Sequence, residues 1–310
     1  MKPLSAKNLR GNWATLLLPI NEDDSIDFVR LADEIDILIS MKVSGIYSNG
    51  TACEFYNQTE SEFDRISELL AERCNRAGAA FQIGVSHTGP VISLERLKRA
   101  VVLQPGAVQV ILPDWVPVTM NEAADFLKKM AEIAGDIGMV LYNPGHAKRC
   151  LTPEEIGFLK RAVPSLIGVK LAGGNEAWFS SMKQHAPGIA IFVPGHHLAS
   201  MLQLGAHGSY SNVACINPKA AQCWYVQMLT DIDAALASEK RIFAFIDTCI
   251  KPYITEQNYS CQAVDKLMAV IGGWANLTPR LRFPYRWIPQ EEADRLKPIA
   301  RKMLPEFFYE

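Results

Sequence analysis

Residues 138–174 read GMVLYNPGHAKRCLTPEEIGFLKRAVPSLIGVKLAGG, which predicts a strand, a helix and a second strand in that order. Two short apolar runs, Gly138–Asn143 and Leu166–Ala172, flank an amphipathic segment over 152–162. The Thr152-Pro153 pair marks the helix start, because Thr caps the first turn and Pro fits the first helical position. Near-continuous apolar strands are typical of parallel sheets covered on both faces. The stretch therefore predicts one strand–helix–strand unit of an α/β protein.

The same alternation continues over much of the chain. The predicted strands are Trp13–Pro19, Gly45–Gly50, Phe81–Ser86, Ala107–Pro113, Gly138–Asn143, Leu166–Ala172, Ile189–Gly195 and Gly208–Val213. The predicted helices lie near 26–40, 59–76, 91–103, 119–136, 152–162, 175–185, 197–204 and 217–236. Eight strands that each precede a helix predict a closed (β/α)8 barrel, or TIM barrel. The alternative is an open doubly wound sheet, but no Gly-x-Gly-x-x-Gly follows the first strand.

The last part of the chain has a different pattern. Segments Lys240–Ile254, Ala263–Gly272 and Glu291–Met303 read as helices separated by Gly-Gly and Pro-rich turns. We therefore expect a catalytic barrel domain over 1–236 and a helical extension over 237–310 that packs on it.

Composition narrows the function classes. The formal net charge of −2 gives no electrostatic signature for nucleic acid or an anionic membrane. No uncharged apolar run is long enough to span a bilayer. The seven cysteines are scattered and never spaced as Cys-x-x-Cys, which favours reduced thiols over disulfides or structural zinc. We therefore expect a cytoplasmic globular protein that binds neither nucleic acid nor membrane.

Lys170 is the one charged residue of the apolar run over 166–172. Catalytic groups of such barrels lie at the carboxyl ends of strands, where Lys170 is predicted to be. The lysine either extends to solvent, or is desolvated and supplies a neutral amine that can form a Schiff base with a carbonyl group. Tyr142 ends the preceding strand. Its hydroxyl could carry protons for that amine, or its ring could simply pack.

Thr51 follows the second predicted strand in a Gly-Thr-Ala-Cys-Glu turn. Its hydroxyl could accept a hydrogen bond from Tyr142. The backbone N–H groups of Thr51 and Ala52 could form a small nest for a carboxylate. As a plain turn, the same residues need no function.

Four motifs in register resemble the dihydrodipicolinate synthase / N-acetylneuraminate lyase family of class I aldolases. They are Gly50–Glu54, Tyr142–Pro144, Gly168–Lys170 and Gly208–Asn212, and the likeness extends over about residues 11–236 and into the helical tail. The resemblance implies a (β/α)8 barrel that works as a homo-oligomer, a dimer or tetramer. It also implies an enzyme without cofactor or metal that binds pyruvate or another 2-oxo acid as a lysine Schiff base.

By the same resemblance, Lys170 forms the imine, Tyr142 is the acid and base, and Thr51 relays its proton. The residues expected to contact the substrate are Gly50, Ala52, Trp115, His146, Ser209 and Ser211.

Two departures argue against a dihydrodipicolinate synthase proper. Ala52 replaces a hydroxyl residue, and Trp115 stands where the synthase has a proton-carrying Tyr, although an indole N–H only donates. The favoured function is a lyase that makes or breaks a C–C bond next to the imine, with an aldehyde as the second substrate. The alternatives are a 2-keto-3-deoxy sugar acid dehydratase or hydratase-aldolase using the same imine, and a non-catalytic 2-oxo acid binding protein.

A metal-dependent enzyme in the same barrel would need clustered His and carboxylate ligands. The adjacent pair His196 and His197 is the suggestive feature, but no third ligand stands at a convincing position. We therefore expect no metal.

Overall fold

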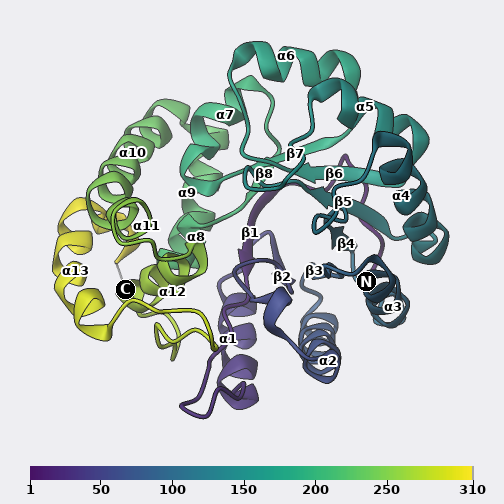
Figure 1. Ribbon diagram of the computed structural model, residues 1–310. Coiled ribbons are helices and arrows are strands. Elements are labelled where there is room, and N and C mark those ends of the chain that lie inside the picture. The colour runs from purple at the N-terminus through teal and green to yellow at the C-terminus, as the bar shows by residue number, and fades with distance from the viewer. Residues whose placement is uncertain (309–310) are drawn as a thin grey trace.

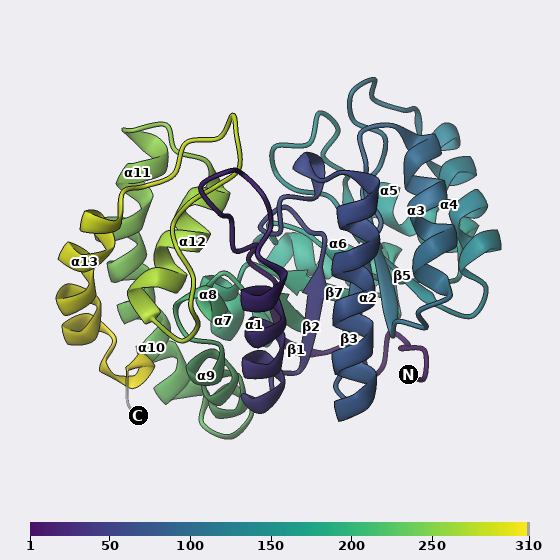
Figure 2. The same cartoon turned by 90° about the horizontal axis from the view of Figure 1, so that it is seen from below.

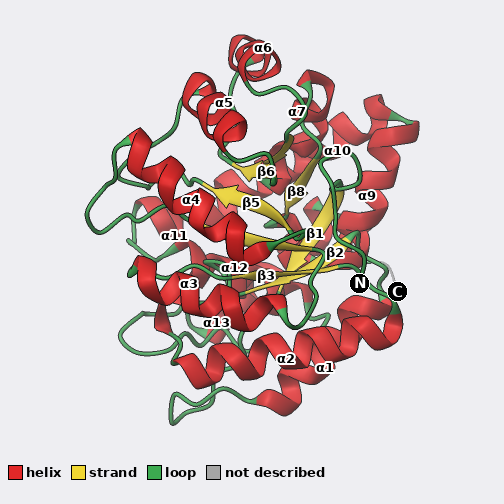
Figure 3. Ribbon diagram, turned by 90° about the vertical axis from the view of Figure 1, so that its right-hand side faces the viewer, coloured by secondary structure: helices red, strands yellow, loops and turns green. Residues whose placement is uncertain are grey.

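The computed structural model describes residues 1–308 and confirms the (β/α)8 barrel with a C-terminal helical part (Figure 1). Eight parallel strands follow one another around the barrel in sequence order, and β8 pairs with β1 to close it. The strands are β1 (Gly11–Thr15), β2 (Gly45–Ser48), β3 (Phe81–Gly84), β4 (Ala107–Val110), β5 (Gly138–Tyr142), β6 (Leu166–Lys170), β7 (Ala190–Val193) and β8 (Gly208–Tyr210). Figure 3 shows the strands enclosed by helices.

The helices that follow the strands cover the outside of the barrel. They are α1 (Phe28–Ser40), α2 (Glu60–Ala77), α3 (Pro90–Val101), α4 (Met120–Ala134), α5 (Pro153–Ala162), α6 (Glu176–His185), α7 (Leu198–Leu204), α8 (Val213–Ile216) and α9 (Pro218–Thr230). The helix start read from the sequence at Thr152 is confirmed at α5, and the same motif begins α2 and α4. Thr59, Thr119 and Thr152 each form a capping box with the Glu three residues later.

The first strand begins two residues before its predicted start. Gly11 donates its N–H to the carbonyl of His207 at 3.0 Å, which brings β1 into register with β8. The indole of Trp13 fills the space beside Gly45, where an added Cβ would lie 2.6 Å from the ring. Gly208 pairs with Gly11, and an added Cβ at Gly208 would lie 2.4 Å from the Gly11 carbonyl oxygen, so this glycine lets β1 pair earlier than its apolar run indicates.

The single helix predicted over 217–236 is wrong, because the structure has two helices there. Asp231 is extended, with φ of −149°, and its side chain accepts a hydrogen bond from the N–H of Ala234. Asp231 therefore ends α9 and caps a new helix, α10 (Ile232–Phe245).

The C-terminal helices lie together on one side of the barrel, beside α8 and α9, as Figures 1 and 2 show. After α10 come a π-helical turn (Ile246–Ile250), α11 (Lys251–Thr255), α12 (Cys261–Gly272) and α13 (Gln290–Met303). Helix α12 packs against α8 and α13. Residue 236, where we expect the barrel domain to end, lies within α10, and the division into two domains stays a prediction.

Large side chains fill the barrel below its carboxyl end. Trp13, Tyr47, Phe192 and Tyr210 are all buried there, with the rings of Phe192 and Tyr210 4.7 Å apart. The interior is thus a packed core and leaves open space only above these rings, as is usual in such barrels. Among the described residues, no helix has both the length and the apolar character needed to cross a membrane.

Candidate active site

Lys170 is the last residue of β6, and its side chain rises above the aromatic layer of the barrel core. Tyr142, the last residue of β5, is its partner in the strand register. The Lys170 Nζ atom lies 4.1 Å from the centre of the Tyr142 ring. It lies 5.1 Å and 5.3 Å from the ring centres of Tyr47 and Tyr210. The amine is therefore enclosed by three aromatic rings at the mouth of the barrel.

This enclosure changes the acidity of Lys170. Burial lowers the pKa of the ammonium from 10.5 to about 8, while the electrostatic interaction with Asp265 opposes the shift. With a pKa near 8, roughly a tenth of the amine is neutral at pH 7, against less than a thousandth for a free lysine. The site therefore holds a usable nucleophilic amine at neutral pH.

Tyr142 is a phenol that keeps its proton at neutral pH. Burial raises the pKa of Tyr142, and hydrogen bonding to the Thr51 side chain acts against that shift. A neutral phenol next to an amine can donate a proton. It can give the proton up fully only when a cation such as an iminium forms beside it.

A cavity of about 640 Å³ opens above these residues. Barrel residues and the C-terminal helices share its wall, the latter contributing Phe243, Asp247, Ile250, Lys251, Cys261, Asp265 and Met268 among others. The extension therefore closes one side of the barrel mouth. A largely apolar wall with a few polar groups is typical of a small-molecule site.

The structure brings most of the predicted site residues together. Thr51, Ala52, Tyr142, His146, Lys170 and Ser211 all line this cavity. Gly50 and Ser209 do not. An added Cβ at Gly50 would lie 2.8 Å from the Tyr47 ring, so this glycine allows close packing. Ser209 is fully buried and alternates with the inward-facing Tyr210 along β8, which turns its side chain away from the barrel interior.

Trp115 lies in a second, adjoining cavity of about 430 Å³. The two cavities share Thr51, Tyr142, Pro144 and His146. The Trp115 side chain is 78% exposed, and the Lys148 ammonium lies 4.9 Å above its ring. Tyr56 and Tyr285 add two more aromatic rings to this second cavity.

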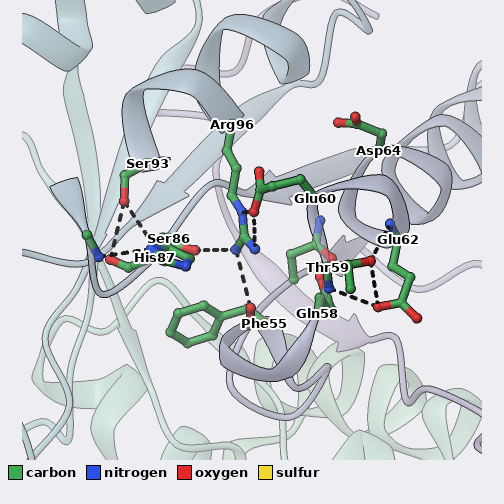
Figure 4. A network of polar contacts seen from close by, with 12 residues as sticks. Phe55, Gln58, Thr59, Glu60, Glu62, Asp64, Ser86, His87, Ser93 and Arg96 are labelled. Atoms are coloured by element: carbon green, nitrogen blue, oxygen red, sulfur yellow. Dashed lines mark hydrogen bonds and ion pairs between the residues drawn. The ribbon is translucent and has the colours of Figure 1, made fainter. Parts of the chain in front are cut away.

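Buried ionic contacts hold the turn that carries Thr51. Glu54, at the end of that turn, pairs with Lys266 of α12 at 3.0 Å, and both side chains are buried. Figure 4 shows the second anchor, in which the buried Arg96 of α3 donates to the carbonyl oxygens of Phe55 and Ser86. Arg96 also pairs with Glu60 at the start of α2. The position of Thr51 is thus fixed from two sides.

The backbone of this turn leaves two donors free. Within residues 1–308, neither the Thr51 nor the Ala52 N–H donates to another protein group, whereas the N–H groups of Cys53, Glu54 and Phe55 all bond back to the turn. Two unused N–H groups beside a cationic amine can hold an anion such as a carboxylate.

Sequence reasoning missed Asp265, which shares the cavity with Lys170. A signal was present, because Asp265 and Lys266 are the only charged residues in the apolar helix Cys261–Gly272. The histidine pair after β7 also lines the cavity. Burial lowers the pKa of His196 to about 4, so its ring is neutral at pH 7. Residues 1–308 contain no group of three or more His, Cys, Asp or Glu side chains arranged to bind a metal ion.

Comparison with known proteins agrees with this geometry. The model of the "Dihydrodipicolinate synthetase family" matches residues 8–303. An N-acetylneuraminate lyase of Escherichia coli (strain SE11) is 24% identical over 313 aligned positions, covering 97% of this chain and 99% of the relative.

Two solved structures share the fold. One is a prophage protein of the dihydrodipicolinic acid synthase family from Escherichia coli K12, in complex with pyruvate. Its TM-score is 0.84 at 20% identity, covering 95% of this chain and 98% of that one. The other is a catalytic lysine mutant of the sialic acid aldolase from Ruminococcus gnavus. Its TM-score is 0.82 at 17% identity, and the match covers 100% of both chains.

Proposed function

Because this chain belongs to the dihydrodipicolinate synthetase family and is an enzyme of the class I lyase type, we propose that it forms a Schiff base between Lys170 and a 2-oxo acid. The enzyme then makes or breaks the C–C bond next to the imine. The observation that carries the proposal is the Lys170 amine, whose pKa burial lowers to about 8 and which lies 4.1 Å from the Tyr142 ring.

The first step joins the amine to the substrate carbonyl. The lone pair of neutral Lys170 Nζ attacks the carbonyl carbon, and the oxygen leaves as water after it has gained two protons. The product is an iminium ion, whose positive charge draws electrons from the neighbouring bond.

Cleavage then follows from the same electron flow. The bond that breaks joins the first and second carbons beyond the iminium carbon, and the second of these carries a hydroxyl group. Loss of the hydroxyl proton gives an aldehyde, and the electrons of the broken bond form an enamine on Lys170. Protonation of the enamine carbon and addition of water release pyruvate and restore the amine. Condensation is the reverse sequence, with an aldehyde as the second substrate.

Tyr142 is positioned to move these protons, because its hydroxyl shares the cavity with Lys170. Thr51 supplies a hydroxyl partner for the phenol. The free N–H groups of Thr51 and Ala52 receive the substrate carboxylate, as their unused donors support. His146 and Trp115 line the adjoining cavity, where we place the aldehyde. The homo-oligomer implied by the resemblance stays a prediction.

The relatives support the same reaction class. A structural neighbour was solved in complex with pyruvate, and another is described as a catalytic lysine mutant of a sialic acid aldolase. Transferred to this chain, the two descriptions agree with a pyruvate-like substrate and with Lys170 as the reacting lysine.

The direct test is borohydride trapping. Reduction of the iminium in the presence of pyruvate leaves a stable adduct, which intact mass and peptide mapping locate. We expect the adduct on Lys170 and none in Lys170→Ala. Lys160 is an internal control, because burial also lowers its pKa but it lies on α5, outside both cavities. A folded wild-type enzyme that forms no adduct with pyruvate or with a panel of longer 2-oxo acids would refute the proposal.

A further inference from the structure

Asp265 places a carboxylate on a mostly apolar wall of the Lys170 cavity. It belongs to α12, and the C-terminal residues around it are mostly apolar, such as Phe243, Ile250 and Met268. The next residue, Lys266, does not line the cavity and pairs with Glu54 instead. The two charged residues of α12 therefore have different contacts: Lys266 holds the turn that carries Thr51, and Asp265 faces the cavity.

The Asp265 carboxylate has no partner of its own. Within residues 1–308 its side chain forms no hydrogen bond and no ion pair. Burial raises the pKa of Asp265 to about 7, and the charge of Lys170 opposes that rise. The other carboxylate of the cavity, Asp247, is paired with Lys251 at 3.1 Å. Asp265 is half-buried and faces the cavity, so water can pair with it in the empty site, and a substrate that displaces this water must bring a donor of its own.

The chemistry of that partner follows from the carboxylate. An ionised carboxylate only accepts hydrogen bonds, so its partner must carry an O–H or N–H group. Lys170 acts on Asp265 only through its charge, because no hydrogen bond or ion pair joins the two side chains within residues 1–308, and the iminium keeps a single N–H. A donor on the part of the substrate that extends away from the imine carbon can fill this role.

His196 completes the polar side of the cavity. Its backbone N–H donates to Asn212 Oδ1 at 3.3 Å, which turns the Asn212 amide so that Nδ2 donates to His196 Nδ1 at 2.9 Å. The Nδ1 atom also lies 3.2 Å from Asn212 Oδ1, but the shorter contact favours the tautomer with its proton on Nε2, which is then a donor. A hydroxyl group can both accept and donate on this polar side of the cavity, whereas a methyl group can do neither.

We propose that Asp265 accepts a hydrogen bond from a hydroxyl or amino group on the distal part of the substrate, and so selects 2-oxo acids that carry such a donor. The inference rests on the proposed function, because Lys170 fixes the other end of the substrate. A distal methyl group leaves Asp265 unpaired, and a distal carboxylate repels it. Both are disfavoured.

The test compares two 2-oxo acids that differ only at the far end. The probes are 5-hydroxy-2-oxopentanoate and 2-oxohexanoate, in which a methyl group replaces the hydroxyl, together with the pair one carbon longer. The readout is the concentration that gives half-maximal borohydride trapping on Lys170, so turnover is not needed. Three proteins are compared: wild type, Asp265→Leu and the control Asp294→Asn, which removes a carboxylate from α13 outside the cavity.

In wild type and Asp294→Asn we expect half-maximal trapping of the hydroxy acid at a concentration about 10- to 100-fold lower than that needed for the acid with the methyl group. This is the usual contribution of a hydrogen bond to a charged group. In Asp265→Leu this preference disappears, while pyruvate still forms its adduct. Asp265→Asn keeps one acceptor and should give an intermediate preference.

Two outcomes overturn the inference: a wild type without preference in either pair, or a preference that survives in Asp265→Leu. Failure of pyruvate to form any adduct in wild type is a separate result and refutes the proposed function instead.

Discussion

The lowered pKa of Lys170 sets the pH dependence of imine formation. Only the neutral amine attacks, so the rate follows the neutral fraction. With a pKa of about 8, that fraction is roughly a tenth at pH 7 and nine tenths at pH 9, a rise of about tenfold that then levels off. A lysine at the ordinary 10.5 would give a rise of about a hundredfold over the same range and no plateau. Tyr142 does not disturb the profile, because its raised pKa keeps it protonated there.

The assay is rapid mixing with a limiting concentration of pyruvate, followed by timed borohydride quenches at constant pH and intact-mass readout. Asp265→Asn gives an internal check. Removing a carboxylate that raises the pKa of Lys170 should move the midpoint of the profile to lower pH. If the logarithm of the rate of imine formation still rises linearly with pH beyond pH 10, or is already constant below pH 7, Lys170 does not have the lowered pKa that its surroundings imply.

Further expectations concern catalysis and stability. Tyr142→Phe should slow turnover by about 10²- to 10⁴-fold while pyruvate trapping on Lys170 persists, as kinetics and mass mapping on one preparation can show. Lys266→Met leaves the Glu54 carboxylate buried and unpaired, so urea unfolding should show a loss of about 3–5 kcal/mol, and adding Glu54→Gln should recover much of it. Lys170→Met removes a cation whose folded-state pKa is depressed. It should raise the free energy of unfolding by about 3 kcal/mol at pH 7, a gain that shrinks as the pH rises from 8 towards 10.5. EDTA should leave trapping unchanged, and a loss that zinc restores would contradict an imine mechanism without metal.

The fold was predictable because its signals are local. Each capping box, such as that of Thr152 and Glu155, and each apolar run is legible within a few residues. The order of the elements and the alternation of strands with helices then leave few possible topologies, because helices that join parallel strands cross over with one handedness. The errors arose where a single residue decided the boundary. Asp231 divides a continuous helical pattern, and the close pairing of Gly11 with Gly208 advances the first strand.

The candidate site was predictable in part, for the same reason. Tyr142 and Lys170 could be paired because consecutive strand ends meet at the barrel mouth. Asp265 could not be placed, because its position depends on how α12 packs against the barrel. That packing is set by contacts such as Lys266 with Glu54, which are far apart in the sequence. Gly50 and Ser209 lie in the expected motifs, but only the detailed turn and strand geometry shows that neither lines the cavity.

The contribution of α12 to the cavity wall has a consequence during protein synthesis. On the ribosome, Lys170 emerges well before the helix that later encloses it. Until α12 docks, water can reach the amine, and a solvated lysine keeps its ordinary pKa and stays almost entirely protonated. Docking of α12 therefore completes an enclosure that the barrel rings begin, and it also brings the Asp265 carboxylate, which acts in the opposite direction on the pKa. The amine reaches its final acidity only after this late part of the chain has folded over the mouth.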